Sequence, residues 1–246
     1  AFERRDAALR RLAFDELLAL QVGMVARRRQ RAVAAALSVT IADGRDAAIR
    51  AALAGALGAL IGRPAELTAD QEAAMAAVRH DLAGRHPMLR LLQGDVGSGK
   101  TAVAAFGLAL AAEAGFQGAL LAPTDLLARQ HAATLGDLLA PLGIPVTLLT
   151  SSLSGPGAAA ALDAIADGRA AVVVGTHALF SERVRYARLG LVVVDEQHRF
   201  GVEQRGALEA KTTGGAAHVL LMTATPIPRT LGQVLYADLD VSDLRS

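Results

Sequence analysis

One glycine-rich segment has the residue types and the spacing of a phosphate-binding loop. The segment is Gly94, Asp95, Val96, Gly97, Ser98, Gly99, Lys100 and Thr101. It matches every fixed position of the pattern G-x-x-x-x-G-K-[ST]. Glycines let backbone N–H groups converge on an anion, and the first turn of a following helix adds the positive end of its dipole. We expect Lys100 to reach the β- and γ-phosphates of a nucleotide and the Thr101 hydroxyl to coordinate Mg²⁺.

Two other interpretations of this loop are weaker. A glycine-rich turn without a ligand is one, but the loop stands between an expected strand and an expected helix, which is the context that phosphate binding needs. A dinucleotide-binding fingerprint is the other, but Ala102 stands where that pattern needs a glycine. Lys100 and Lys211 are the only lysines among 25 basic residues. A lysine inside the loop therefore favours a chemical role, with base-composition bias as the plain alternative.

Two acidic residues follow the apolar run 191–194, which is expected to be a buried strand. In an ATPase with a phosphate-binding loop, the metal on the nucleotide lies over this edge of the sheet. We expect Asp195 to hold Mg²⁺ through water and Glu196 to polarise the attacking water as a general base. Acids after a strand are more often a helix cap, but together with the loop the catalytic interpretation is favoured.

Other chemical signals are weak. Thr223 and Thr225 follow the apolar run 219–222 and could relay hydrogen bonds from the nucleotide to a moving partner, although a turn before Pro226 explains them equally well. The six histidines show no zinc-binding spacing.

Short apolar runs alternate with helical stretches from residue 67 onward. Strands are expected at 88–92, 118–122, 146–149, 171–174, 191–194 and 219–222, and helices at 70–83, 100–114, 125–140, 156–167 and 202–210. Continuous apolar runs are typical of strands buried on both faces. The pattern predicts an α/β fold with a mostly parallel sheet flanked by helices, whose ligands bind at the carboxyl ends of the strands.

The N-terminal segment has a different character. Residues 1–31 carry eight arginines against four acidic residues, and their leucines recur at near-helical spacing. This predicts one amphipathic helix that ends in the basic cluster 27–31, which either neutralises phosphates or, more commonly, is a solvated helix end. The alanine-rich residues 32–63 have helical propensity.

Composition excludes several classes of protein. The chain has 246 residues, 52% of them hydrophobic, and no cysteine, which excludes disordered and disulfide-stapled proteins and a cysteine nucleophile. The apolar run 51–61 is shorter than the roughly 20 residues that cross a bilayer. Because the first residue is Ala1 rather than Met, we expect a piece of a longer protein. The short apolar run and the absence of cysteine favour a cytoplasmic protein without a membrane partner.

Assembled, these motifs resemble those of superfamily-two helicases, and most closely the RecG branch-migration DNA helicases. The resemblance covers residues 66–245 and depends on three long blocks, at 91–101, 195–205 and 222–230. The segments 122–131 and 175–179 resemble motifs that face DNA. The resemblance implies that residues 1–65 are a helical connector at the end of a truncated DNA-binding wedge region, and that residues 66–246 are the first RecA-like, ATP-binding lobe.

The resemblance also implies an ATP-driven motor on branched double-stranded DNA, such as stalled forks and Holliday junctions, in recombination and repair near a bacterial nucleoid. By position, Gln71 would read adenine. Coupling of the ATP state to the DNA grip would fall to Gln197, His198, Thr223 and Thr225. The DNA path would include Thr124, Thr176 and His177.

Three departures from the family pattern limit these expectations. Ala65 stands where an aromatic residue is common, and Ser151 stands where glycine is usual. The chain stops at Ser246, so the second RecA-like lobe with its arginine finger is expected to lie elsewhere in the longer protein, and this lobe is not expected to unwind DNA alone. A transcription-repair coupling factor, which usually has Glu at the position of Gln197, and a nucleotide-binding module without independent activity remain alternatives.

Overall fold

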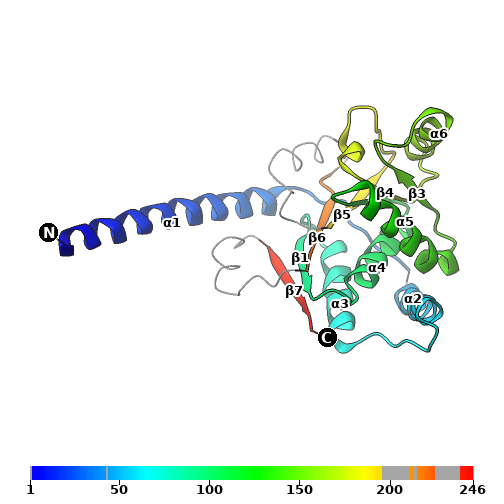
Figure 1. The fold of residues 1–246 in the computed structure, drawn as a ribbon, viewed down its shortest axis with the longest axis horizontal. Coiled ribbons are helices and arrows are strands. Elements are labelled where there is room, and N and C mark those ends of the chain that lie inside the picture. Colours follow the sequence, from blue (N-terminus) through cyan, green and yellow to red (C-terminus); the bar gives the residue numbers. More distant parts are fainter. Residues whose placement is uncertain (1, 43, 196–210, 213–214, 225–238, 246) are drawn as a thin grey trace.

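The fold is an α/β lobe that carries one long N-terminal helix (Figure 1). The structure, a computed structural model, describes residues 2–42, 44–195, 211–212, 215–224 and 239–245. The helices are α1 (Phe2–Val33), α2 (Arg45–Ile61), α3 (Ala69–Leu82), α4 (Lys100–Glu113), α5 (Asp125–Leu139) and α6 (Gly155–Ala166), with short 3₁₀ helices η1 (Ala140–Leu142) and η2 (His177–Phe180). The strands are β1 (Leu89–Gly94), β2 (Gln117–Leu121), β3 (Val146–Leu149), β4 (Val172–Gly175), β5 (Leu189–Asp195), β6 (His218–Thr223) and β7 (Asp240–Leu244).

The sheet is parallel throughout and confirms the predicted fold class. Its strand order within the described residues is β3-β4-β2-β5-β6-β1-β7, and each neighbouring pair runs in the same direction. The six predicted strands are present, displaced at their ends by up to two residues. The helix expected at 202–210 lies outside the described residues.

The continuous apolar runs are explained by burial on both faces of the sheet. On β5, Leu191 and Val193 point into a core shared with α2, α3, α4 and α5. Val192 and Val194 point into a second core, formed with α6, η2 and the segment that follows η2. All four side chains are almost fully buried, so a central strand here needs apolar residues at every position.

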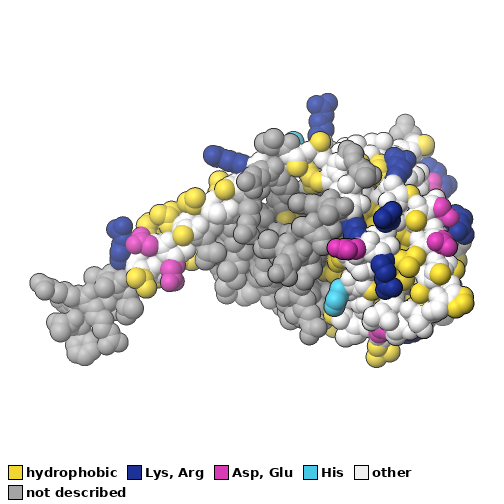
Figure 2. Space-filling view, turned by 90° about the horizontal axis from the view of Figure 1, so that it is seen from above, with side chains coloured by type: hydrophobic (Ala, Val, Ile, Leu, Met, Phe, Trp, Pro, Cys, Tyr) yellow, Lys and Arg dark blue, Asp and Glu magenta, His cyan; other side chains and the backbone are white. Residues whose placement is uncertain are grey.

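Helix α1 extends away from the lobe toward the N-terminus (Figure 1), as the leucine spacing predicts for its helical state. Apolar side chains lie exposed along it (Figure 2), among them Leu12, Phe14 and Val22. None of the helices in the described part of the chain is long and apolar enough to span a membrane.

The helical prediction for residues 32–63 is only partly correct. Residues 35–42 form an extended segment that lies against the lobe, and α2 begins at Arg45. Backbone N–H groups of this segment donate to lobe carbonyls: Ala36 to Arg85 at 3.1 Å, Leu37 to Ala216 at 3.4 Å and Val39 to Leu82 at 2.9 Å. Alanine content favours a helix, but these pairings with the lobe replace the helical hydrogen bonds.

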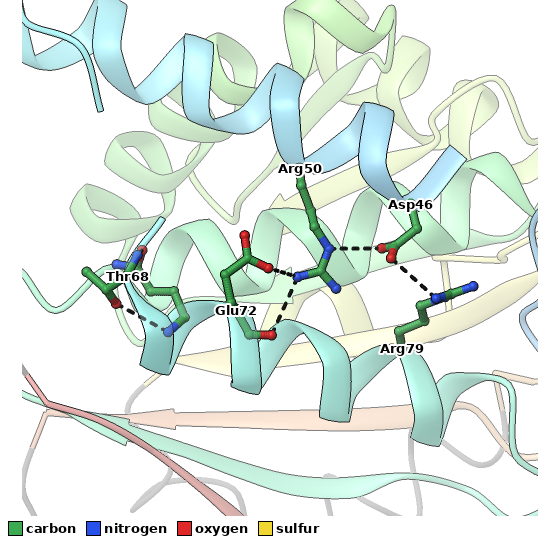
Figure 3. A network of polar contacts seen from close by, with 6 residues as sticks. Asp46, Arg50, Thr68, Glu72 and Arg79 are labelled. Carbon is green, nitrogen blue, oxygen red and sulfur yellow. Dashed lines mark hydrogen bonds and ion pairs between the residues drawn. The ribbon is translucent and has the colours of Figure 1, made fainter. Parts of the chain in front are cut away.

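A polar network joins α2 to α3 on the face of the lobe that carries the nucleotide loop's helix (Figure 3). Arg50 Nε donates to Asp46 Oδ1 at 3.2 Å, and its Nη1 contacts the Glu72 carboxylate. Arg79 Nη1 donates to Asp46 Oδ2 at 3.3 Å. The Arg50 guanidinium also lies 4.7 Å from the ring centre of Phe106 on α4. Arg50 thus ties three helices together.

Strand β7 was not predicted from the sequence. Its residues are largely polar and half-exposed, so the segment lacks the apolar run that marks the other strands. The strand is defined by its parallel pairing with β1. Arg90 of β1 strengthens this pairing, because its Nη1 donates to Ser242 Oγ at 2.9 Å. The Nε of Arg90 donates to Asp81 Oδ2 on α3 at 2.7 Å.

Candidate nucleotide-binding site

The glycine-rich loop connects the end of β1 to the start of α4. Gly97 and Gly99 have φ values of 87° and 85°, a left-handed backbone that favours glycine. A Cβ atom on Gly99 would also collide with the side-chain nitrogen of Gln71. The backbone therefore favours glycine at both positions. At position 99 a Cβ atom would also displace the amide of Gln71, whereas Gly97 faces open space.

The loop fits a bound phosphate group. No side chain caps the first turn of α4 among the described residues, and that turn contains no acidic residue, so the positive end of the helix dipole is left for an anion. Ser98 Oγ is buried without a hydrogen-bond partner in the described structure. Asp95 and Val96 form the exposed tip of the loop, and Thr101 lies half-buried in the first turn of α4.

Lys100 is folded back over the loop. Its Nζ donates to the carbonyl oxygens of Gly94 at 2.6 Å and Asp95 at 2.8 Å. Burial lowers the pKa of the Lys100 ammonium group, and the charges of Asp195 and Asp95 oppose that shift. The ammonium group is therefore held beside the loop, within the field of the predicted metal ligand.

Sheet order brings the predicted catalytic groups to one edge. Strand β6 lies between β5 and β1. Asp195, the last residue of β5, pairs in register with Met222, and Gln93 pairs with Thr223. Because parallel strands end at the same edge, Asp195, Thr223 and the start of the loop lie at neighbouring strand ends. Glu196, Gln197, His198 and Thr225 lie outside the described residues.

Gln71 contacts the loop directly. Its side-chain oxygen accepts from the Thr68 N–H at 3.0 Å, and Thr68 Oγ1 accepts from the Gln71 N–H at 3.3 Å, which is a capping box at the start of α3. The Gln71 side-chain nitrogen donates to the Ser98 carbonyl oxygen at 3.0 Å. Gln71 is therefore tied to the loop, and its contact with adenine remains a prediction.

The residues expected along the DNA path differ in exposure. Thr124 is exposed and caps α5, with Oγ1 accepting from the Leu127 N–H at 3.3 Å. Thr176 is buried and His177 is exposed, both directly after β4. Strands β2 and β4 are neighbours, and the Ala122 N–H donates to the Gly175 carbonyl at 2.8 Å. These residues therefore follow adjacent strand ends, and their contact with DNA remains a prediction.

His131 is a site residue that the sequence analysis missed. Its Nε2 lies 2.7 Å from Asp195 Oδ2. His131 lies inside the segment 122–131 and has no zinc-binding spacing. The signal that points to it is helical: position 131 lies seven residues, about two turns, beyond Thr124 and so on the same side of α5.

A family model described as DEAD/DEAH box helicase matches residues 68–234. The chain belongs to the DEAD/DEAH box helicase family. This helicase domain is 52% identical over 188 residues to the ATP-dependent DNA helicase RecG of Treponema pallidum, covering 74% of this chain and 27% of that protein. It is 46% identical over 239 residues to RecG of Escherichia coli K12, covering 96% of this chain and 33% of that protein.

Solved structures agree with the sequence relatives. A structure of RecG bound to a three-way DNA junction matches with a TM-score of 0.80 at 35% identity, covering 96% of this chain and 30% of that chain. A hypothetical RNA helicase from Sulfolobus tokodaii matches with a TM-score of 0.56 at 19% identity, which shows the shared fold alone. The predicted resemblance to RecG is confirmed. The helicase domain spans about a third of the length of these RecG relatives.

Proposed function

We propose that this helicase domain is the ATP-binding lobe of an ATP-dependent DNA helicase that acts on branched double-stranded DNA. The observation that carries the proposal is the placement of a complete phosphate-binding loop and Asp195 at the carboxyl ends of β1 and β5, which are separated by β6 alone. The RecG relatives and the RecG structure with a three-way junction support the choice of substrate.

Each residue of the loop has a separate task in this proposal. Backbone N–H groups of the loop and the first turn of α4 bind the phosphates. Lys100 exchanges its two carbonyl acceptors for phosphate oxygens, and the resulting ion pair is stronger than the contacts it replaces. Thr101 and Asp195 would hold Mg²⁺, which would neutralise charge on the β- and γ-phosphates. Glu196 would take a proton from the attacking water, and Gln71 would contact adenine.

The DNA path and the coupling to it complete the proposal. Thr124, Thr176 and His177 would contact DNA phosphates without reading sequence. Gln197, His198, Thr223 and Thr225 would couple the nucleotide state to the DNA grip. We infer that a second RecA-like lobe in the remaining length of such a helicase supplies an arginine finger, which is worth about 10³–10⁵ in rate, and that a wedge domain supplies the contact with the junction.

ATP binding and hydrolysis test the proposal separately. The 246-residue chain is expected to bind a fluorescent ATP analogue in the presence of Mg²⁺ and to hydrolyse ATP feebly. The full-length protein is expected to hydrolyse ATP rapidly when forked DNA is added. Lys100→Ala should abolish binding in the chain and turnover in the full-length protein. If Lys100→Ala keeps both ATP-analogue binding and ATP turnover, the assignment of the loop is wrong. Rapid DNA-stimulated turnover by the 246 residues alone would overturn the need for a second lobe.

A further inference from the structure

We propose that His131 is a positioning residue for Asp195, and that through this contact α5 holds the metal ligand of the ATP site in place. The proposal rests on the proposed function, because it assigns Asp195 to Mg²⁺. It concerns a side chain on a different element from either the phosphate-binding loop or β5, and 64 residues away from Asp195 in the sequence.

The contact has the geometry of a strong hydrogen bond. His131 Nε2 and Asp195 Oδ2 are 2.7 Å apart. A carboxylate can only accept, so the proton lies on Nε2 and the ring donates it. The two side chains are 15% and 17% exposed, so water competes little with the bond. A bond to an ionised acceptor in such surroundings restricts the rotation of the carboxylate.

Helix α5 is a firm support for this donor. Four of its side chains, Ala128, Leu135, Leu138 and Leu139, are fully buried in the core beneath the sheet. The helix begins at the Thr124 cap, directly after β2, and β2 pairs with β5 along its length. His131 lies in the middle of α5, between the buried Ala128 and Leu135, and it meets Asp195 at the end of the strand that neighbours β2.

Helix α5 carries both a residue of the proposed DNA path and the residue that contacts the proposed metal ligand. Thr124, at its first turn, belongs to the proposed DNA path, and His131, two turns further, contacts the proposed metal ligand. A rigid helix moves as one element, so a shift of the Thr124 end on DNA would change the hydrogen bond to Asp195. We therefore infer that His131 affects both the use of Mg²⁺ and its dependence on DNA.

Removal of the donor should weaken the use of Mg²⁺ without removing ATP binding. In the full-length helicase, His131→Ala is expected to raise the Mg²⁺ concentration for half-maximal, DNA-stimulated ATPase activity by about 10-fold, the lower end of the cost seen when a hydrogen-bond partner of a metal ligand is lost. Affinity for the ATP analogue without Mg²⁺ should stay unchanged. The ratio of DNA-stimulated to basal turnover should fall.

Three further variants keep the test decisive. His131→Gln places an amide N–H near the position of Nε2 and should restore most of the Mg²⁺ dependence. His131→Asn places it near Nδ1, out of reach of Asp195, and should behave as His131→Ala does, which preserves the test if the alanine variant does not fold. Asp137→Ala, at an exposed position of the same helix, should leave the Mg²⁺ curve unchanged.

The outcomes separate this proposal from the function beneath it. If the wild-type helicase lacks Mg²⁺-dependent ATPase activity, or Lys100→Ala leaves that activity intact, the proposed function fails. If the wild type is active and Lys100→Ala is inactive, but His131→Ala and His131→Asn keep the wild-type Mg²⁺ curve, only the role of His131 fails. An equal rise in half-maximal Mg²⁺ for the Gln and Asn variants would also overturn it.

Discussion

The side-chain nitrogen of Gln71 donates a 3.0 Å hydrogen bond to the carbonyl oxygen of Ser98, and so joins the first turn of α3 to the phosphate-binding loop. The oxygen of the same amide caps α3 by accepting from the Thr68 N–H. One glutamine therefore sets both the start of a helix and the position of the loop. Substitution of Gln71 can separate the bond to Thr68 from the bond to Ser98.

Gln71→Glu should separate the loop contact from the helix cap. Glutamate keeps an oxygen that accepts from Thr68 N–H, so α3 should stay capped. Its second oxygen cannot donate to the Ser98 carbonyl and repels it, so the loop loses its support. Gln71→Ala loses both bonds and should lower the free energy of unfolding by about 2 kcal/mol, at about 1 kcal/mol for each bond. Both variants should weaken binding of the ATP analogue, and urea unfolding should distinguish them. Unchanged affinity for the ATP analogue in Gln71→Glu would contradict the support of the loop by Gln71.

Gly99→Ala should damage the site far more than Gly97→Ala. Both positions have left-handed backbones, so each alanine costs about 1–2 kcal/mol in strain. A Cβ at position 99 additionally collides with Gln71, whereas position 97 faces open space. Binding of the ATP analogue and thermal unfolding of the two variants measure the difference. If the two variants lose the same stability, the contact between Gly99 and Gln71 is not a constraint on the loop.

His218 should make the lobe less stable in mild acid. It is fully buried, its Nδ1 accepts from the Met88 N–H at 3.0 Å, and its Nε2 donates to the Leu37 carbonyl at 2.7 Å. Burial lowers the pKa of His218, although the bond to Leu37 and the charge of Asp81 oppose the shift. The unfolded chain then binds a proton before the folded chain does. This contribution is complete above about pH 6.5, the ordinary pKa, and is lost as the pH falls below it.

The measurement is the free energy of unfolding at pH 8, 7, 6 and 5. The slope that His218 adds below pH 6.5 should approach but not exceed about 1.4 kcal/mol per pH unit. His218→Gln should remove that slope. His80→Gln is the matched control, because His80 is exposed on α3, and it should leave the profile as it is. A slope that survives His218→Gln would assign the acid sensitivity to another group.

Arg50→Ala should destabilise the lobe because Arg50 joins α2, α3 and α4. It is 16% exposed and bonds to two carboxylates, and it lies over Phe106. A partly buried arginine with these contacts contributes about 2–3 kcal/mol, and chemical denaturation measures the loss. Arg11→Ala removes an exposed pair with Asp15 on α1 and should change stability by less than about 0.5 kcal/mol. Similar losses in both variants would contradict the special role of Arg50.

Local sequence patterns are enough to predict the fold class and the phosphate-binding loop. Apolar runs without alternation indicate strands buried on both faces, and their alternation with helical stretches indicates a parallel sheet covered by helices. The loop is local: the pattern fixes four of its eight residues, Gly94, Gly99, Lys100 and Thr101, at a set spacing. Such constraints are written in neighbouring residues, so a short pattern is enough to find them.

Contacts between segments that are far apart in the sequence are visible only in the folded chain. Strand β7 is polar and exists because β1 offers it an edge to pair with. The extended segment 35–42 abandons its helical propensity because lobe carbonyls and His218 satisfy its backbone. His131 reaches Asp195 only because the crossing of α5 and the order of β2 and β5 bring them together. Pairings of this kind depend on packing between residues far apart in the chain, and no local pattern records them.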